Sequence, residues 1–157
     1  MYKVFLSYSM NAEEMVVAWR LQTLASASGV HLDVPGPEIR SNWDAVAERI
    51  RTSDSIIALL TRRATKQVKR EIEYAASLQK HVIPIVERGA LDPALKRILD
   101  ASGATIFELD PANPGKMEQD LATFLQGRKY SKTARNVVLA LAGTLVGLLL
   151  LQELAEQ

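Results

Sequence analysis

The sequence predicts an α/β fold in which a parallel sheet carries helices on both faces. Short apolar segments alternate five times with segments whose apolar residues repeat at helical spacing. The runs 56–60 and 82–85 are almost continuously apolar, as expected for strands that are buried on both faces. With right-handed crossovers, we expect a flavodoxin-like topology with five strands in the order 2-1-3-4-5.

The individual elements follow from apolar spacing and from turn residues. Strands are expected at residues 3–9, 30–34, 55–61, 81–86 and 104–109. Helices are expected at residues 12–28, 43–52, 91–101 and 117–126, with a further helix that begins after Thr65. Thr65, Asn42 or Ser41 can serve as N-caps, Asp92-Pro93 suits a first helical turn, and Gly29 suits a helix end. Residues 35–37 and 110–115 are expected to be loops because they are rich in proline and glycine.

Length and composition limit the class of protein. The 157 residues are enough for one domain with a sizeable core, and the net charge of +1 gives no indication of a nucleic-acid partner. The chain has no cysteine, which excludes disulfides, thiolate nucleophiles and cysteine-based zinc sites. His31 and His81 each lie beside an expected strand, so no metal site is predicted. The N-terminus runs directly into a strand without a secretory pattern, which predicts a cytoplasmic domain.

The C-terminal part has a different composition from the rest. Residues 129–136 form a basic linker, residues 137–152 form a hydrophobic helix, and residues 153–157 form an acidic tail. The uncharged run spans roughly 22 Å, short of the roughly 30 Å hydrocarbon core, whereas residues 134–154 would reach across it. Basic residues before the run would keep the N-terminal domain cytoplasmic if the helix crosses the inner membrane. The alternative is a soluble bundle, and Gly143 with Gly147 favours self-association in either case.

The segment after the third strand holds the candidate catalytic residue. Its apolar positions Val68, Ile72 and Ala75 form one helical stripe, and Glu71 flanks this stripe. Glu71 is therefore expected near the mouth of a crevice between strand and helix, where open α/β sheets bind ligands. Because most helix glutamates are solvated, the spacing alone also allows an ordinary surface residue.

Four ordered motifs together resemble the Toll/interleukin-1 receptor (TIR) domain of the bacterial type. They are Val4-Phe5-Leu6-Ser7-Tyr8-Ser9, Ser53-Asp54-Ser55-Ile56-Ile57, Val68-x-x-Glu71-x-x-x-Ala75 and Ile83-Pro84-Ile85. The resemblance covers residues 1–128. It implies cleavage of NAD+ by a glutamate at the position of Glu71, with NAD+ as substrate and no cofactor.

The remaining candidate residues would hold NAD+. The turn Ser7-Tyr8-Ser9 offers hydroxyls and N–H groups at a helix N-terminus, suited to a diphosphate, although ordinary capping would explain it too. The resemblance implies that the loop from Asp33 to Asn42 gates the site and contacts a neighbouring copy. Trp43 can stack on a base or pack in the core.

Two further residues depart from, or add to, the resemblance. Gln67 stands four residues before Glu71, where bacterial TIR enzymes often carry an aromatic residue. Arg70 can restrain Glu71 through an ion pair or contact a phosphate.

Three functions are consistent with these features. The first is a self-assembling NAD+ glycohydrolase or cyclase, which the resemblance places in bacterial anti-phage defence or signalling. The second is a non-enzymatic adaptor that acts through TIR–TIR contacts. The third is another glutamate-dependent nucleoside enzyme, such as a nucleoside deoxyribosyltransferase, on a related fold.

Overall fold

The computed structural model describes residues 2–9, 15, 18–19, 22–23, 26, 30–60, 65–87 and 89–109. Within this part of the chain, a five-stranded sheet has the strand order β2-β1-β3-β4-β5, and every neighbouring pair is parallel. The strands are β1 (Tyr2–Ser7), β2 (Val30–Asp33), β3 (Ser55–Leu60), β4 (His81–Glu87) and β5 (Phe107–Leu109). The predicted parallel topology is therefore confirmed, although β5 begins three residues later than expected.

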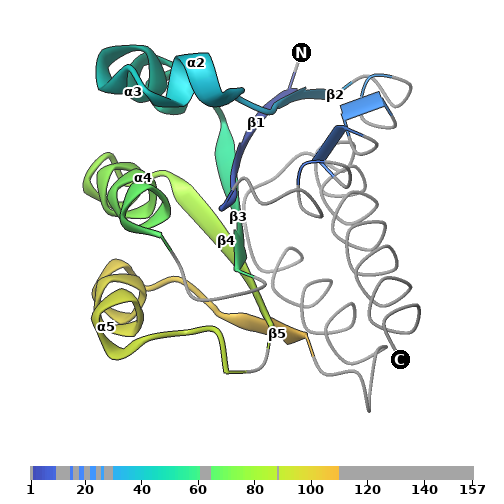
Figure 1. Ribbon diagram of the computed structural model, residues 1–157. Coiled ribbons are helices and arrows are strands. Elements are labelled where there is room, and N and C mark those ends of the chain that lie inside the picture. The colour runs from blue at the N-terminus through green and yellow to red at the C-terminus, as the bar shows by residue number, and fades with distance from the viewer. Residues whose placement is uncertain are drawn as a thin grey trace, which may run out of the picture.

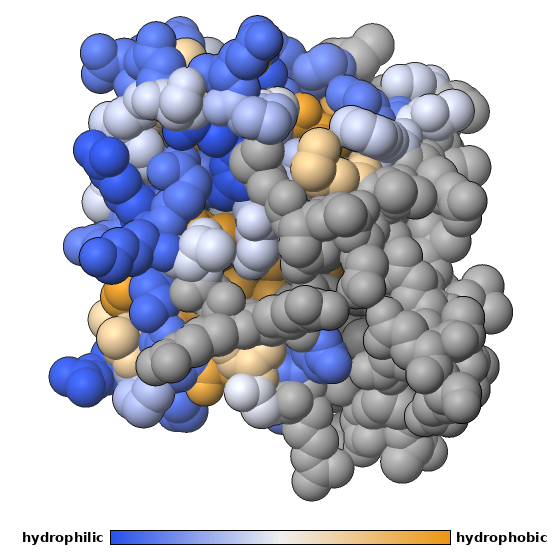
Figure 2. Space-filling model, in the orientation of Figure 1, coloured by the Kyte–Doolittle hydropathy of each residue, from blue (hydrophilic) through white to orange (hydrophobic). Residues whose placement is uncertain are grey.

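Three helices lie along one face of this sheet, as Figure 1 shows. They are α3 (Trp43–Arg51), α4 (Lys66–Ser77) and α5 (Pro93–Ser102). The side chains of Asn42, Thr65 and Asp92 accept hydrogen bonds from the first turns of these helices, which confirms the N-caps predicted at Asn42 and Thr65. The helix expected from residue 91 begins at Pro93, so Asp92 is its N-cap. The surface above α3 and α4 is mostly hydrophilic (Figure 2), as expected for helices that bury only one side.

The core forms where the inner sides of these helices meet alternate residues of the strands. Phe5, Ile56, Ala58 and Leu60 point toward the helices, and they pack with Val68, Ile72 and Ala75 of α4 and with neighbours from α3 and α5. The intervening strand residues are also buried; they include Val4, Leu6, Ile57, Leu59, Ile83 and Ile85. The strands are thus buried on both faces, as their apolar runs predict.

One short helix was not predicted. Residues 35–37 were expected to be a loop, but Pro37 is the first residue of α2 (Pro37–Arg40). The fixed φ of proline suits the first helical position, where its missing N–H is not needed. The expectation failed because a four-residue helix is too short to show an apolar period. As a result, Arg40 is held in helical geometry directly before α3.

Several predictions fall outside the described residues. Positions 15, 18–19, 22–23 and 26 are helical, but the rest of the helix expected at 12–28 is outside, as are Gly29 and Thr61. The loop at 110–115, the helix at 117–126, the linker at 129–136, the hydrophobic helix at 137–152 and the tail at 153–157 also lie outside. None of the helices in the described ranges has the length and apolar character needed to cross a membrane.

Candidate active site

The candidate site lies at the end of β1, where successive connections of the chain run to opposite sides of the sheet. From β1 the chain first passes to β2 on one side and then returns to β3 on the other side. Ser7 is the last residue of β1 and is paired with Ala58 of β3. The helix α4 follows β3 and also contacts β1. This is the topological switch point at the carboxyl ends of the strands, where open α/β sheets place their ligands.

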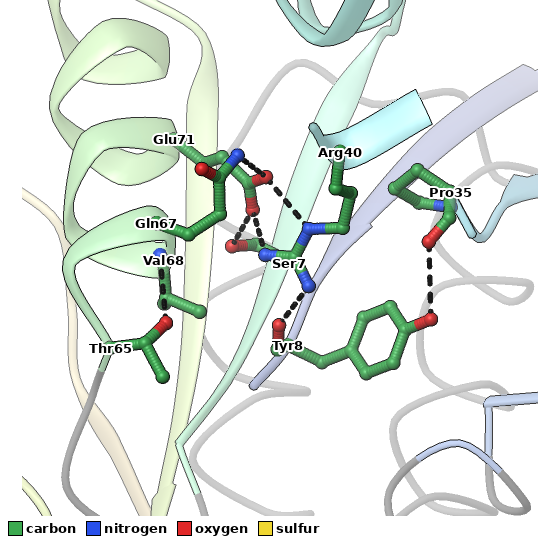
Figure 3. Close-up of polar contacts among 8 residues, drawn as sticks. All are labelled: Ser7, Tyr8, Pro35, Arg40, Thr65, Gln67, Val68 and Glu71. Atoms are coloured by element: carbon green, nitrogen blue, oxygen red, sulfur yellow. Dashed lines mark hydrogen bonds and ion pairs between the residues drawn. The ribbon is translucent and has the colours of Figure 1, made fainter. Parts of the chain in front are cut away.

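The Glu71 carboxylate is completely buried at this point and is held by side chains from three elements (Figure 3). Its Oε1 accepts from the Ser7 hydroxyl at 2.7 Å and from Nη2 of Arg40 at 2.7 Å. Its Oε2 accepts from Nε of Arg40 at 3.0 Å and from Nε2 of Gln67 at 2.9 Å. A carboxylate has about four acceptor positions, so these four bonds fill them. Glu71 was expected near the mouth of a crevice, but its side chain is fully buried on the inner side of α4.

Arg40 neutralises this buried carboxylate through a bidentate ion pair, the strongest arrangement for these two groups. Its side chain is only 4% exposed. The remaining Nη1 donates to the backbone oxygen of Tyr8, and the guanidinium carbon lies 5.1 Å from the centre of the Tyr8 ring. The Tyr8 hydroxyl donates in turn to the Pro35 oxygen at 3.2 Å. The end of β1 and the segment 35–40 are therefore tied together at two points.

Local sequence explains why Glu71 points inward. Thr65 fixes the start of α4 by accepting from the Val68 N–H at 3.2 Å. From that start, Val68, Ile72 and Ala75 face the sheet, and Glu71 shares their buried side. Gln67 lies one turn before Glu71 and can reach its carboxylate from the same face. The residue at this position is thus a hydrogen-bond donor to Glu71.

Trp43 and Arg70 meet at a different place, at the contact between α3 and α4. Trp43 is partly buried against the hydrophobic core, as one of its two interpretations expected, and Arg70 is exposed. The Arg70 guanidinium lies 3.8 Å from the centre of the Trp43 ring, and the edge of the same ring system contacts Tyr74 at a centroid distance of 5.5 Å. Arg70 therefore does not form the ion pair with Glu71 that its position allowed. Asp33 is paired with Arg49 at 2.6 Å, at the end of β2.

The structure thus separates the predicted residues into groups. Ser7 and Gln67 contact Glu71, and Tyr8 contacts its partner Arg40. Ser9, the next residue after Tyr8, is partly buried. Trp43 and Arg70 form a second pair, and Asp33 stands apart from both. Sequence reasoning missed Arg40. The only available signal was its place within the expected gating loop, since Arg40 is separated from Glu71 by 31 positions. No three acidic or histidine side chains in the described ranges are grouped closely enough to hold a metal ion.

Comparison with known proteins identifies the family. The sequence profile of the TIR domain matches residues 4–125. The chain belongs to the TIR domain family. No curated protein sequence matches it significantly.

Solved structures agree on the fold of this TIR domain. The CMP N-glycosidase BcmB from Clostridium botulinum matches with a TM-score of 0.56 and 16% identity, over 76% of this chain and 98% of that one. The TIR domains of the activated Roq1 resistosome, which directly recognises the pathogen effector XopQ, match with a TM-score of 0.56 and 11% identity, over 81% of this chain and 99% of that one. At such identities the likeness concerns the fold alone.

Proposed function

We propose that this TIR domain cleaves the N-glycosidic bond of NAD+ as a self-assembling glycohydrolase or cyclase, with Glu71 as the catalytic carboxylate. The observation that supports this most is the position of Glu71: a buried carboxylate at the switch point of a TIR fold, beside the end of β1. A solvated helix glutamate would not accept hydrogen bonds from residues of β1, α2 and its own helix α4. Glutamate side chains are almost never fully buried unless they are paired, and this one lies at the edge of the sheet where open α/β folds bind ligands.

The chemistry needs little more than a well-placed negative charge. In NAD+ the bond between ribose C1′ and the nicotinamide nitrogen breaks, and its electron pair leaves with nicotinamide, which becomes neutral. The ribose then resembles an oxocarbenium ion, whose positive charge a carboxylate stabilises. Water attacks C1′ and loses a proton to give ADP-ribose, or an adenine nitrogen attacks and gives a cyclic product. Glu71 would stabilise the cation and bind the ribose hydroxyls.

The surrounding side chains would position the carboxylate and the nucleotide. Ser7 donates to one oxygen of Glu71 and Gln67 donates to the other, which would restrain the orientation of the carboxylate. Tyr8 and Ser9 stand at the end of β1, where a diphosphate would approach. Trp43 would stack on the base and Arg70 would contact a phosphate in place of their present contact with each other, and Asp33 would lie in the loop that gates the site.

A non-enzymatic adaptor is the alternative, and one specific observation favours it. The Glu71 carboxylate has no exposed surface, and its acceptor positions are filled by Ser7, Arg40 and Gln67. In that state it can serve as a structural anchor between α4, α2 and β1. The domain would then act only by binding other TIR domains.

NAD+ consumption by the full chain at high protein concentration tests the proposal. The Glu71→Gln variant keeps the size of the side chain and should lose about 100-fold or more of the activity, because it removes the charge that stabilises the transition state. Glu73→Gln is the matched control, since Glu73 is an exposed glutamate on the same helix and its loss should leave turnover unchanged. CMP, as substrate of a structural neighbour, is assayed in parallel.

Each outcome separates the candidates. Turnover of NAD+ that depends on Glu71 supports the enzyme, whereas equal turnover by Glu71→Gln excludes Glu71 as the catalytic residue. Turnover of CMP alone would support the nucleoside enzyme, and no turnover by correctly folded protein at any concentration would support the adaptor. A second comparison, of the full chain in detergent with a chain ending at Gln126, asks whether the hydrophobic segment at 137–152 drives assembly or acts only as an inner-membrane anchor.

A further inference from the structure

The motif Ser53-Asp54-Ser55 lies outside the group of residues around Glu71, although it is one of the four segments that carry the resemblance to TIR domains. It joins the end of α3 to the start of β3. The Ser53 hydroxyl donates to the Arg49 oxygen at 2.7 Å, near the end of α3. Asp54 instead contacts Lys3 of the neighbouring strand β1, from which it is separated by 51 positions.

Asp54 and Lys3 form a reciprocal pair of hydrogen bonds. The Asp54 N–H donates to the Lys3 oxygen at 2.8 Å, and the Lys3 N–H donates to Oδ2 of Asp54 at 2.8 Å. The pairing of β1 with β3 begins one residue later, at Val4 and Ser55. The Asp54 side chain therefore takes the place of a strand residue beside Lys3, and it holds the first part of β1 at a fixed position along β3.

The apolar middle of β1 defines the position of this strand only weakly. Val4, Phe5 and Leu6 are each at most 1% exposed, and they are buried on both faces of the sheet. A strand with one solvated face resists slipping by one residue, because the slip would turn its apolar side chains to water. Since β1 has no solvated face, its apolar residues define its lengthwise position only through their size and shape. Its polar ends must therefore define the register.

Ser7 is the residue whose contact depends on this register. It is completely buried, and its hydroxyl donates to Oε1 of Glu71 at 2.7 Å. Lys3 and Ser7 are four residues apart, which is about 13 Å along a strand. A shift of β1 by one residue would bring Leu6 or Tyr8 to Glu71, and the buried carboxylate would lose one of its donors.

We infer that Asp54 is a positioning residue, which fixes β1 lengthwise through Lys3 and so brings the Ser7 hydroxyl to Glu71. Asp54 acts from the opposite end of the strand and does not contact the carboxylate itself. This role concerns the hydrogen bonds of Glu71 and does not depend on whether Glu71 is catalytic. It gives the Ser53-Asp54 part of the motif a physical function in the fold, at a distance from the site that it supports.

A double-mutant cycle between Asp54 and Ser7 tests this role in the full chain. Ser7→Ala should change the unfolding equilibrium constant of the original protein by about 30-fold, the usual effect of losing a hydrogen bond to a charged group. In the Asp54→Ala background the same change should have an effect of about tenfold or less, because fewer molecules hold Ser7 against Glu71. Sites this far apart without a shared partner normally combine to within about twofold. An effect of Ser7→Ala that stays within this scatter of its original value would overturn the inference.

A conservative variant and a control separate the hydrogen bond from other roles of the aspartate. Asp54→Asn keeps an oxygen that can accept from the Lys3 N–H, so Ser7→Ala should regain nearly its original effect in this background. Asp44→Ala is the matched control, because Asp44 is an exposed aspartate in the first turn of α3, and it should leave the effect of Ser7→Ala unchanged. If Asp54→Asn behaved like Asp54→Ala, or if Asp44→Ala also weakened the effect, the bond to Lys3 would not be responsible and the inference would fail.

Nuclear magnetic resonance with a second variant covers the case in which Asp54→Ala does not fold. The Arg40 Nε–H donates to Oε2 of Glu71 at 3.0 Å, so its resonance reports on the carboxylate. Asp54→Glu keeps the charge but places the carboxylate one methylene further from the backbone, which must shift Lys3 or break the bond. The Arg40 resonance should move in Asp54→Glu and stay in place in Asp44→Glu. An unmoved resonance in Asp54→Glu would overturn the inference.

Discussion

Two neighbouring residues of α4, Arg70 and Glu71, have opposite environments. Glu71 is fully buried against the end of β1, where three side chains from three elements hold it (Figure 3). Arg70 is exposed, and its guanidinium lies over the ring of Trp43, which is itself partly buried against the core. Consecutive helical residues are about 100° apart, which is enough to place one in the core and the other in solvent.

The difference shows that the contribution of a charged side chain to stability depends on how deeply it is buried. A buried ion pair becomes essential once it exists, because neither partner can lose the other without leaving a charge in a poorly solvated place. An exposed cation over an aromatic ring contributes roughly 0.5–1 kcal/mol, since water competes for the same charge. Mutations on the inner side of α4 should therefore affect stability and function together, and mutations on the outer side should affect stability only slightly.

The largest effect should come from breaking the buried pair one partner at a time. Arg40→Ala or Glu71→Ala alone should lower the free energy of unfolding by about 3–5 kcal/mol, because each leaves the other charge unpaired. The double variant Arg40→Ala with Glu71→Ala should be much more stable than the sum of the single losses predicts. Urea denaturation of the four proteins measures the coupling, expected at about 2 kcal/mol or more. Strictly additive losses would contradict the pairing.

A smaller effect is expected when only one neutral donor is removed. Ser7→Ala deletes the 2.7 Å hydrogen bond to Glu71 and should cost about 2 kcal/mol, the usual range for a bond to a charged group. Ser77→Ala is the control, because that exposed hydroxyl donates only to the Tyr74 backbone oxygen near the end of the same helix. Its loss should change the unfolding free energy by less than about 0.5 kcal/mol. If both variants lost the same unfolding free energy, the hydrogen bond from Ser7 would not stabilise the Glu71 carboxylate.

The sequence predicts this contrast only in part. The alternation of strands and helices, the order of the strands and the caps at Asn42 and Thr65 follow from local spacing and turn chemistry, and the structure has them. These features depend on residues within a few positions of one another. The sequence also indicates Glu71 as the candidate catalytic residue. It does not predict how deeply Glu71 is buried, because a glutamate at the edge of an apolar stripe gives no local sign of a buried partner.

The partner itself could not be predicted, for a physical reason. Arg40 and Glu71 lie 31 positions apart and meet only because α2 is folded against the ends of β1 and α4. Pro35-Gly36-Pro37 reads as a loop, and although Pro37 suits the first position of a helix, a four-residue helix is too short to show an apolar period. Similarly, Trp43 and Arg70 were each assigned to the nucleotide separately, while their contact with each other depends on how α3 and α4 pack.

The smallest effect should be found on the outer side of α4. Arg70→Ala removes the cation from the Trp43 ring and should lower the unfolding free energy by about 0.5–1 kcal/mol, with part of that loss due to contact with the alkyl stem. Lys96→Ala is the reference, because Lys96 and Asp100 form an exposed pair of a kind worth at most a few tenths of a kcal/mol. High salt should erase the Lys96 effect but leave most of the Arg70 effect, since a guanidinium stacked at 3.8 Å also gains from dispersion and apolar contact. If the Arg70 loss instead approached that of the buried pair, the outer side of α4 would carry a structural role comparable to that of Glu71.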